Sequence, residues 1–483
     1  MSTPPAAGPA LAAAPAALAP LPVPPSPARA TAAAARAART KLLLEGPIAP
    51  TLARLAAPNV VAMGVMAATS IAEGVFAGLL GVSALAGLAL VFPLVMLTQM
   101  LSAGAFGGAI SSALARALGA GDSDRAERLV WHAGIVAAAA AALSALLVAV
   151  WGAPLFALLG GHGPALQAAL AYAGIFFPGC IAVWLCHTCL SLLRGTGNMA
   201  MPSQILLLVS LVSIPLSGAL ALGWGPFPAL GMTGLAAGIV IAHVLGAVLA
   251  LGYLATGRAG LDPLRGLAPL QAALFRDILK VGLIASLSAV QTVFTIVVMV
   301  GLVGRFGEAA LAGYGLGARL EFLMVPVVFG IGAAMTAMVG ANTGAGQHRR
   351  AQAIAWTGSF AAAGLVGGIG LFFAAFPDLW LGLFVAPGDA ATLAAGRAYF
   401  GIAAPFYGFF ALGLGLYFAG QGAGRVLGPV LAGLARAAVA VGGGLALTAW
   451  TDLGLAGVFL AIAAGMVTFG LAAGLWVHLA RRR

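Results

Sequence analysis

The chain has 483 residues, of which 62% are hydrophobic and only 7% are charged, with a formal net charge of +11 and a mean hydropathy of +1.08. Because a soluble domain carries about 25% charged residues, this composition excludes a soluble globular protein and predicts a polytopic protein in a lipid bilayer. The positive charge does not predict a nucleic-acid partner, since the basic residues lie at the ends of apolar segments without interleaved aromatic residues.

The N-terminal residues 1–46 are rich in alanine and proline. Prolines break both a helix and the apolar core of a signal peptide. We therefore expect a disordered cytoplasmic tail over these residues.

Twelve apolar segments follow, each long enough to cross a bilayer, which takes about 20 helical residues. The most polar internal linker, 257–276, separates the first six segments (N-lobe, 47–256) from the last six (C-lobe, 277–480). The sequence thus predicts an all-α membrane protein with twelve transmembrane helices. The segments are 53–79, 85–116, 129–151, 167–193, 202–223, 231–255, 277–304, 310–341, 353–376, 394–419, 427–449 and 455–479.

The distribution of lysine and arginine predicts the orientation of the chain, because positive charge collects on the cytoplasmic side. Nearly all of these residues lie in the N-terminal tail, in the connections after segments 2, 4, 6, 8 and 10, or at the C-terminus. We expect both termini to be cytoplasmic, in a multi-pass protein of a bacterial inner membrane. Three arginines at helix ends, Arg116, Arg194 and Arg425, are interpreted as topological anchors. The exceptions to the pattern are Arg305, Arg319, Arg397 and Arg436.

An internal repeat relates the two sets of six segments. Several short motifs recur at shifts of 225 to 227 residues, which is hard to obtain by chance. Six spans is an even number, so both lobes enter from the same side and are predicted to be related by a pseudo-two-fold axis along the membrane normal. The matched pairs are 119–131 with 344–356, 81–87 with 307–313, Tyr172 with Tyr399, Pro178 with Pro405, and 195–202 with 422–429.

Only two of the twelve acidic residues, Glu73 and Glu321, fall inside predicted spans. An intramembrane acid costs about 2.5–3.5 kcal/mol even on a lenient scale, so it is a functional hypothesis by default. At 1.5 Å per residue, both lie roughly 15–18 Å from the same end of the membrane. Apolar surroundings favour the neutral form of a carboxyl group, which suits reversible protonation. We predict that both acids are functional ion-coupling residues that bind and release a proton or another ion, with an ion pair between Glu321 and an arginine as the alternative.

Other polar residues inside the spans are candidates for lining a substrate or ion path. Thr69 and Ser70 share a helical face with Glu73, whereas Arg319 is two residues from Glu321 and cannot face it on one helix. Gln99, Ser102 and Gln291 complete this group, although such residues also serve as hydrogen-bonding glue between helices. Cys180, Cys186 and Cys189, with His187 between the last two, are interpreted as buried side chains rather than a metal site, since a structural zinc site takes four grouped ligands and no further ligands are grouped nearby.

The polar turn 116–126 after segment 2, its echo 339–351 after segment 8, and Leu193-Arg-Gly-Thr-Gly-Asn-Met-Ala-Met-Pro202 resemble the multidrug and toxic compound extrusion (MATE) transporters over about residues 47–480. The resemblance implies a two-lobed exporter of cationic or amphipathic compounds, driven by protons or sodium ions. Glu73, followed by Gly78 and Gly81, stands where many members carry an aspartate in the first helix.

The sequence departs from this family at two places. Ser213 and Ser217 stand where some members carry an asparagine and an aspartate in the fifth helix, and Ser286 and Ser288 occupy the region of an acid in the seventh. A hard cation prefers several oxygens and carboxylate charge, so these serines weaken a sodium site and favour a proton as the coupling ion.

Three alternatives remain open. One is a sodium-coupled exporter of the same fold, and another is a flippase for lipid-linked oligosaccharides. The third is an intramembrane transferase, which is disfavoured because Asp122 and Asp124 are the only close acidic pair on a loop. No cofactor and no resident metal are expected, the partners are small-molecule substrates and lipid, and we expect a monomer.

Overall fold

The computed structural model describes residues 27–262, 269–385 and 388–479, and the regular structure in these ranges is helical. In chain order the elements are α1 (Pro27–Glu45), α2 (Ile48–Leu80), α3 (Val82–Gln99), the π helix η1 (Met100–Phe106), α4 (Gly107–Gly119), α5 (Ser123–Leu158), α6 (Gly163–Gly195), α7 (Ala200–Leu222), α8 (Met232–Ala255), α9 (Ala272–Gly304), α10 (Glu308–Gly344), α11 (His348–Ala375), α12 (Asp378–Leu381), α13 (Ala390–Ile402), the 3-10 helix η2 (Ala404–Phe406), α14 (Tyr407–Gly422), α15 (Leu427–Trp450) and α16 (Gly454–Leu479).

Twelve candidate membrane spans are present in the described residues, one for each predicted segment. The predicted all-α fold with twelve spans is confirmed, and most spans begin and end a few residues beyond the predicted limits. The tenth span is not a single helix, because α13 and α14 are joined by η2 around Pro405. A proline lacks the backbone donor of a regular helix, which accounts for the break at this position.

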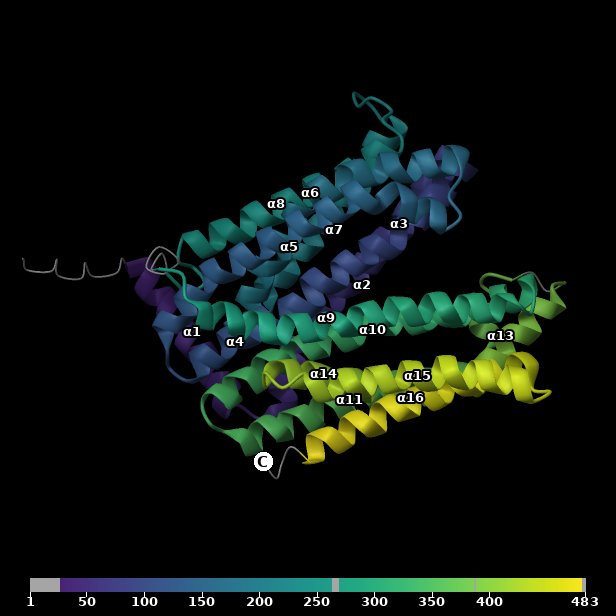
Figure 1. Cartoon of the computed structure of the whole chain (residues 1–483). Helices are drawn as coiled ribbons and strands as arrows, with labels where there is room; N and C mark the ends of the chain where they lie inside the picture. The colour runs from purple at the N-terminus through teal and green to yellow at the C-terminus, as the bar shows by residue number, and fades with distance from the viewer. Residues whose placement is uncertain (1–26, 263–268, 386–387, 480–483) are drawn as a thin grey trace, which may run out of the picture.

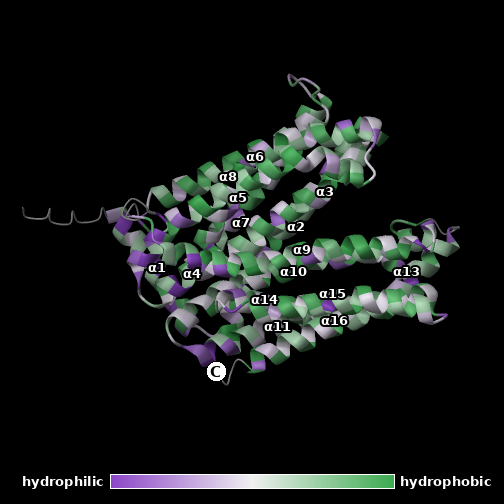
Figure 2. Ribbon diagram, in the orientation of Figure 1, coloured by the Kyte–Doolittle hydropathy of each residue, from purple (hydrophilic) through white to green (hydrophobic). Residues whose placement is uncertain are grey.

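The spans form two bundles, α2–α8 (the N-lobe) and α9–α16 (the C-lobe). Figure 1 shows that the bundles meet near α1, α4 and α14, which we call the closed end, and diverge toward α3 and α13, which we call the open end. Hydrophobic residues run along both bundles, while hydrophilic residues gather around α1 and α4 (Figure 2). The lobes therefore pack together over only part of their length.

The two repeated Gly-Ala-Gly turns meet at the closed end. A Cβ atom added to Gly119 at the end of α4 would overlap the carbonyl oxygen of Ala341 on α10. Reciprocally, a Cβ atom on Gly344 would overlap the carbonyl oxygen of Arg116. Both residue pairs are related by the repeat shift of 225. Backbone contacts without an intervening side chain therefore join α4 to α10 symmetrically.

The π helix η1 gives the second span of the N-lobe one extra residue. This span has 38 residues, whereas its repeat partner α10 has 37. The repeat shift accordingly falls from 226 before η1 to 225 after it. A π helix accommodates one inserted residue inside an α-helix, and such insertions occur often at functional sites. The carbonyl oxygen of Gly104 in η1 accepts a hydrogen bond from Gln421 Nε2 of the C-lobe at 3.2 Å.

The helix α1 corrects the prediction of a disordered tail for residues 27–45, while residues 1–26 lie outside the described ranges. Alanine favours a helix, and Pro27 stands at its first position, where a proline is tolerated. Arg29 Nη1 pairs with Asp262 Oδ2 at 2.7 Å, and the carbonyl oxygen of Leu43 accepts from Asn342 Nδ2 at 2.9 Å. Arg36 Nη2 donates to Ser123 Oγ of α5 at 3.1 Å, so the helix contacts the linker and both lobes at the closed end.

An ion-pair cluster also bridges the lobes there. Asp277 of α9 binds Arg116 Nη2 at 2.8 Å and Arg125 Nη2 at 2.9 Å, and both arginines belong to the N-lobe. Asp277→Asn is expected to lower the free energy of unfolding by about 2 kcal/mol, because removing one member of a partly buried pair leaves the other uncompensated.

Thermal unfolding in detergent micelles measures this loss. The matched control is Asp378→Asn, which breaks an exposed pair with Arg397 inside the C-lobe and is expected to leave the unfolding temperature unchanged. Equal unfolding temperatures for the wild type and Asp277→Asn would contradict the bridging role.

Candidate functional site

The first intramembrane carboxylate belongs to Glu73 on α2. Its side chain is half-buried, and its Oε1 accepts a hydrogen bond from the Tyr172 hydroxyl of α6 at 2.9 Å. Tyr172 is fully buried and stacks on Phe176 with ring centroids 5.8 Å apart. Packing therefore holds the hydroxyl against the carboxylate. Within the described residues, this hydroxyl is the one hydrogen-bond donor recorded for Glu73.

The second carboxylate, Glu321 on α10, has a matching partner in the C-lobe. Its Oε2 accepts a hydrogen bond from the Tyr399 hydroxyl of α13 at 3.1 Å. Tyr399 is fully buried, and its hydroxyl accepts from the Tyr407 hydroxyl at 3.5 Å. Each lobe thus contains one carboxylate bound by one buried tyrosine.

The tyrosines are equivalent in the repeat, but the carboxylates are not. Tyr172 and Tyr399 are related by the repeat shift of 227. Glu73, however, lies on the first span of its lobe, whereas Glu321 lies on the second span of the other. The repeat alignment singled out both tyrosines, and this was the signal that could have identified them as site residues.

A nearby cation further distinguishes the two sites. Arg436 of α15 interacts electrostatically with Glu321 and lies over the rings of Phe410 and Phe469, 5.2 and 5.8 Å from their centroids. Arg319 instead lies over Phe384, 5.9 Å from the ring centroid. The arginine expected near Glu321 is therefore Arg436. No corresponding cation is recorded for Glu73 within the described ranges.

The Tyr399 ring depends on a glycine in α10. A Cβ atom on Gly317 would overlap the Tyr399 ring, and the Gly317 carbonyl oxygen accepts from the Tyr407 hydroxyl at 3.4 Å. Gly317→Ala is therefore expected to displace Tyr399 from Glu321 and to destabilise the C-lobe by about 1–3 kcal/mol through overpacking.

Gly315→Ala is the control for this substitution, since a Cβ atom two residues earlier on the same helix would meet no atom within 4 Å. Thermal unfolding of both variants tests the prediction. If the two variants behave alike, Gly317 does not position the tyrosine.

Thr69 and Ser70, which share a helical face with Glu73, donate no recorded hydrogen bond to its carboxylate within the described residues. The Thr69 hydroxyl donates to the Val65 carbonyl oxygen one turn earlier at 3.3 Å, and Ser70 is exposed. A threonine inside a helix commonly bonds its own backbone in this way. The hydrogen-bond donor to Glu73 is instead the Tyr172 hydroxyl, which belongs to another helix, α6.

The remaining predicted residues are dispersed rather than gathered around one carboxylate. Gln291 Nε2 donates to Thr295 Oγ1 at 2.9 Å on the same helix. Ser213 and Ser217 are both 2% exposed on α7, and a Cβ atom on Gly238 of α8 would lie 2.5 Å from Ser217 Cα. Both serines therefore face the N-lobe interior. The Gln99 Oε1 atom is buried without a hydrogen-bond partner among the described residues.

Ser102 belongs to a buried polar cluster that the sequence did not reveal. Its hydroxyl lies 2.8 Å from His187 Nδ1, and the ring of His187 lies 5.8 Å from that of His243. All three cysteines are buried as free thiols. The cluster joins η1, α6 and α8 inside the N-lobe.

Comparison with known proteins identifies the family of this fold. A family model described as MatE matches residues 58–218 and 284–444, once in each lobe. A FAD transporter of Shewanella oneidensis is 26% identical over 315 residues, or 64% of this chain and 68% of the relative. A probable multidrug resistance protein NorM of Deinococcus radiodurans is 33% identical over 294 residues, or 58% of this chain and 62% of the relative.

Solved structures show the same fold. A MOP superfamily transporter from Pyrococcus furiosus has a TM-score of 0.83 and 24% identity, with 91% of this chain and 97% of that chain covered. An outward-facing conformation of a multidrug resistance MATE family transporter has a TM-score of 0.80 at 24% identity and the same coverage. Because the family model matches more than half of the chain, the chain belongs to the MatE family, whose members are membrane transporters and not enzymes.

Proposed function

We propose that the protein is a proton-coupled antiporter that exports cationic or amphipathic small molecules, with Glu73 as the residue that exchanges the proton. One observation carries the proposal: a carboxylate inside an apolar span is bound by a single buried tyrosine, with no cation recorded beside it in the described residues. Such a group gains or loses a whole charge in a water-poor setting, where charge is most costly.

Antiport requires that proton and substrate favour different arrangements of the two lobes, because a ligand shifts an equilibrium only through differential affinity. Ionised Glu73 attracts a cationic molecule and accepts the Tyr172 hydrogen bond. Uptake of a proton removes that attraction and releases the molecule. Glu321 has Arg436 and Tyr399 as partners, which stabilise its ionised form and suit a supporting role.

The closed end carries the basic residues that the positive-inside rule assigns to the cytoplasm. The conformation described here is then outward-facing, in a bacterial inner membrane with both termini inside. Its likeness to an outward-facing MATE structure supports this orientation.

A proton fits the Glu73 site better than a sodium ion. A hard cation takes several oxygen ligands, whereas Tyr172 directs its hydroxyl hydrogen at the carboxylate. The serines at positions 213 and 217 lack the charge of an aspartate. Sodium coupling is the alternative that the experiment below distinguishes.

The test uses purified protein in liposomes with an imposed pH gradient and ethidium as the probe. Glu73→Gln is expected to reduce proton-driven transport to the level of liposomes without protein, and Glu321→Gln to reduce it less. The control is Glu308→Gln, an exposed acid at the start of α10. Wild-type rates in both Glu73→Gln and Glu321→Gln would refute the proposal, and transport driven by a sodium gradient alone would favour the sodium alternative. FAD is included as a second probe because one relative is a FAD transporter.

A further inference from the structure

One arginine buried between the lobes has no carboxylate partner among the residues that the structure describes. Arg194, at the end of α6, is 3% exposed, and its Nε has no hydrogen-bond partner. Within the described residues the guanidinium lies near the ring of Phe329 on α10, whose centroid is 5.9 Å from the guanidinium carbon, and interacts electrostatically with the Cys186 thiol. Arg116, by contrast, binds Asp277 and the Gly422 carbonyl oxygen. Burying a charge without a compensating partner costs several kcal/mol of free energy. A ligand with a negative charge would offset this cost at Arg194.

Two serines beside Arg194 are also without partners. Ser191 and Ser111 are 1% and 4% exposed, and neither hydroxyl oxygen has a hydrogen-bond partner in the described residues. Both line the same cavity as Arg194. The guanidinium and the two hydroxyl groups together form a set of hydrogen-bond donors suited to an anion.

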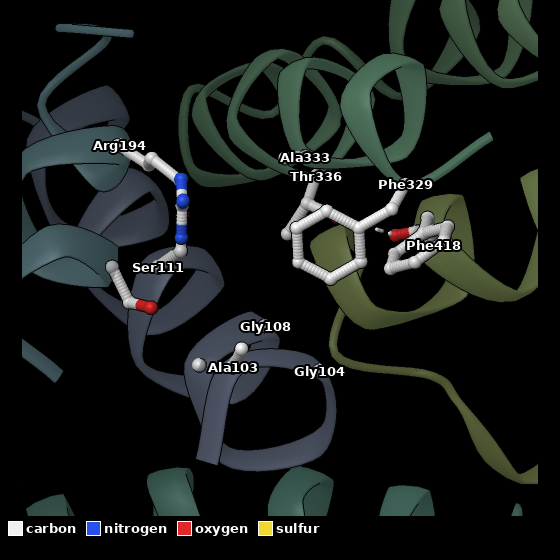
Figure 3. A pocket seen from close by; sticks show the side chains of 11 residues that line it. Ala103, Gly104, Gly108, Ser111, Arg194, Phe329, Ala333, Thr336 and Phe418 are labelled. Carbon is white, nitrogen blue, oxygen red and sulfur yellow. Dashed lines mark hydrogen bonds between the residues drawn. The ribbon is translucent and has the colours of Figure 1, made fainter. Parts of the chain in front are cut away.

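The cavity that these residues line lies between the lobes, near the closed end. Figure 3 shows Arg194 and Ser111 on one side, with Phe329, Thr336 and Phe418 across from them. Its volume is about 20 Å³, which is room for a water molecule but not for an organic molecule. The Thr336 hydroxyl already donates to the Phe418 carbonyl oxygen at 3.0 Å. The unsatisfied donors therefore belong to the N-lobe wall, and the C-lobe covers them with aromatic rings.

We propose that Arg194, Ser111 and Ser191 form a binding site for the anionic group of a transported molecule, a phosphate or a carboxylate. The proposal rests on the transport function proposed above and extends its substrates from cations to amphipathic organic anions. Separation of the lobes at the closed end removes Phe329 and Phe418 from the site. The donors then face the compartment on that side, where a substrate enters. Closure afterwards covers the site with the C-lobe.

The experiment compares two variants, Arg194→Gln and the double variant Ser111→Ala/Ser191→Ala. The serine hydroxyl groups have no partner in this conformation, so their removal leaves no orphaned group and is compatible with folding. Ser359→Ala is the matched control, because Ser359 is also fully buried with an unpartnered hydroxyl but lies on α11, outside the cavity.

Transport of FAD, riboflavin and ethidium is measured in liposomes under one pH gradient. FAD carries two phosphates, riboflavin carries the same ring system without them, and ethidium is a cation. Both test variants are expected to lower the ratio of FAD to ethidium transport at least about tenfold, the value of one lost charge-assisted hydrogen bond. Ser359→Ala should keep this ratio, and the ratio of riboflavin to ethidium should change less than that of FAD.

Three outcomes overturn the anion site. One is an equal fall of FAD and ethidium transport in both variants, which indicates a structural role. Another is that the wild type transports ethidium but not FAD, which leaves the antiport proposal intact. In the third, inorganic phosphate raises the unfolding temperature of the wild type but of neither variant, while the variants keep the wild-type ratio of FAD to ethidium transport. That outcome assigns the site to a free ion. Failure of every probe in the wild type would instead contradict the antiport proposal itself.

Discussion

Replacing Gly119 or Gly344 by alanine is expected to abolish transport while leaving each lobe folded. The added Cβ atom would overlap a backbone carbonyl oxygen of the opposite lobe, Ala341 in one case and Arg116 in the other. A carbonyl oxygen inside a helix cannot rotate away as a side chain can. Overpacking of this kind costs about 1–3 kcal/mol, which changes the ratio of two conformations by roughly 5–150-fold. The closed arrangement of this end should therefore lose most of its population.

Spin labels at two exposed, repeat-equivalent positions, Asp124 and Arg349, measure the separation of the lobes at the closed end. Either alanine substitution should lengthen the most populated distance between the two labels. The double variant Gly119→Ala/Gly344→Ala should lose the short label-to-label distance of the closed arrangement. Gly134→Ala and Gly301→Ala are controls, one in each lobe, since a Cβ atom there would meet no atom within 4 Å. An unchanged distance together with normal transport would show that the turns do not hold this end closed.

Tyr172→Phe is expected to lower proton-driven transport about tenfold or more, with little change in the unfolding temperature. Phenylalanine keeps the ring in its buried position but removes the donor from Glu73. A hydrogen bond to a charged group contributes about 1.5–3 kcal/mol, which is a factor of roughly ten to one hundred and fifty. Tyr399→Phe should have a smaller effect, because Glu321 keeps its interaction with Arg436.

A double-mutant cycle isolates the contribution of this hydrogen bond. If Tyr172 acts through Glu73, the variant Glu73→Gln/Tyr172→Phe should transport no worse than Glu73→Gln alone. Tyr253→Phe serves as the control, since this tyrosine lies on α8 and contacts neither carboxylate. Additive losses in the double variant would indicate that Tyr172 contributes through packing, independently of the carboxylate.

Hydropathy and the internal repeat were enough to predict the fold, because a bilayer admits few arrangements of the backbone. Twenty apolar residues in a row must form a helix there, so both the number of spans and the division into two halves followed from spacing alone. The two acids were equally visible, since charge inside an apolar span is rare.

The partners of those acids were not visible from local spacing. Thr69 and Ser70 stand one turn from Glu73, yet the bond comes from Tyr172, 99 residues away in the chain. The contact depends on how the N-lobe brings the Tyr172 hydroxyl of α6 to the Glu73 carboxylate of α2, which residue spacing within one helix does not encode. The helix α1 was missed for a related reason. The proline-rich residues before it dominated the composition, while its stability comes from contacts with the linker and with both lobes, through Asp262, Ser123 and Asn342.

The extra residue of η1 makes the two halves of the fold unequal. Two identical halves, as in a homodimer, would each carry the inserted residue or each lack it. Here one half has it and the other does not, so the two repeats differ in length as well as in side chains. The irregularity places the Gly104 carbonyl oxygen, which accepts from Gln421, in the N-lobe, while α10 of the C-lobe is an uninterrupted helix.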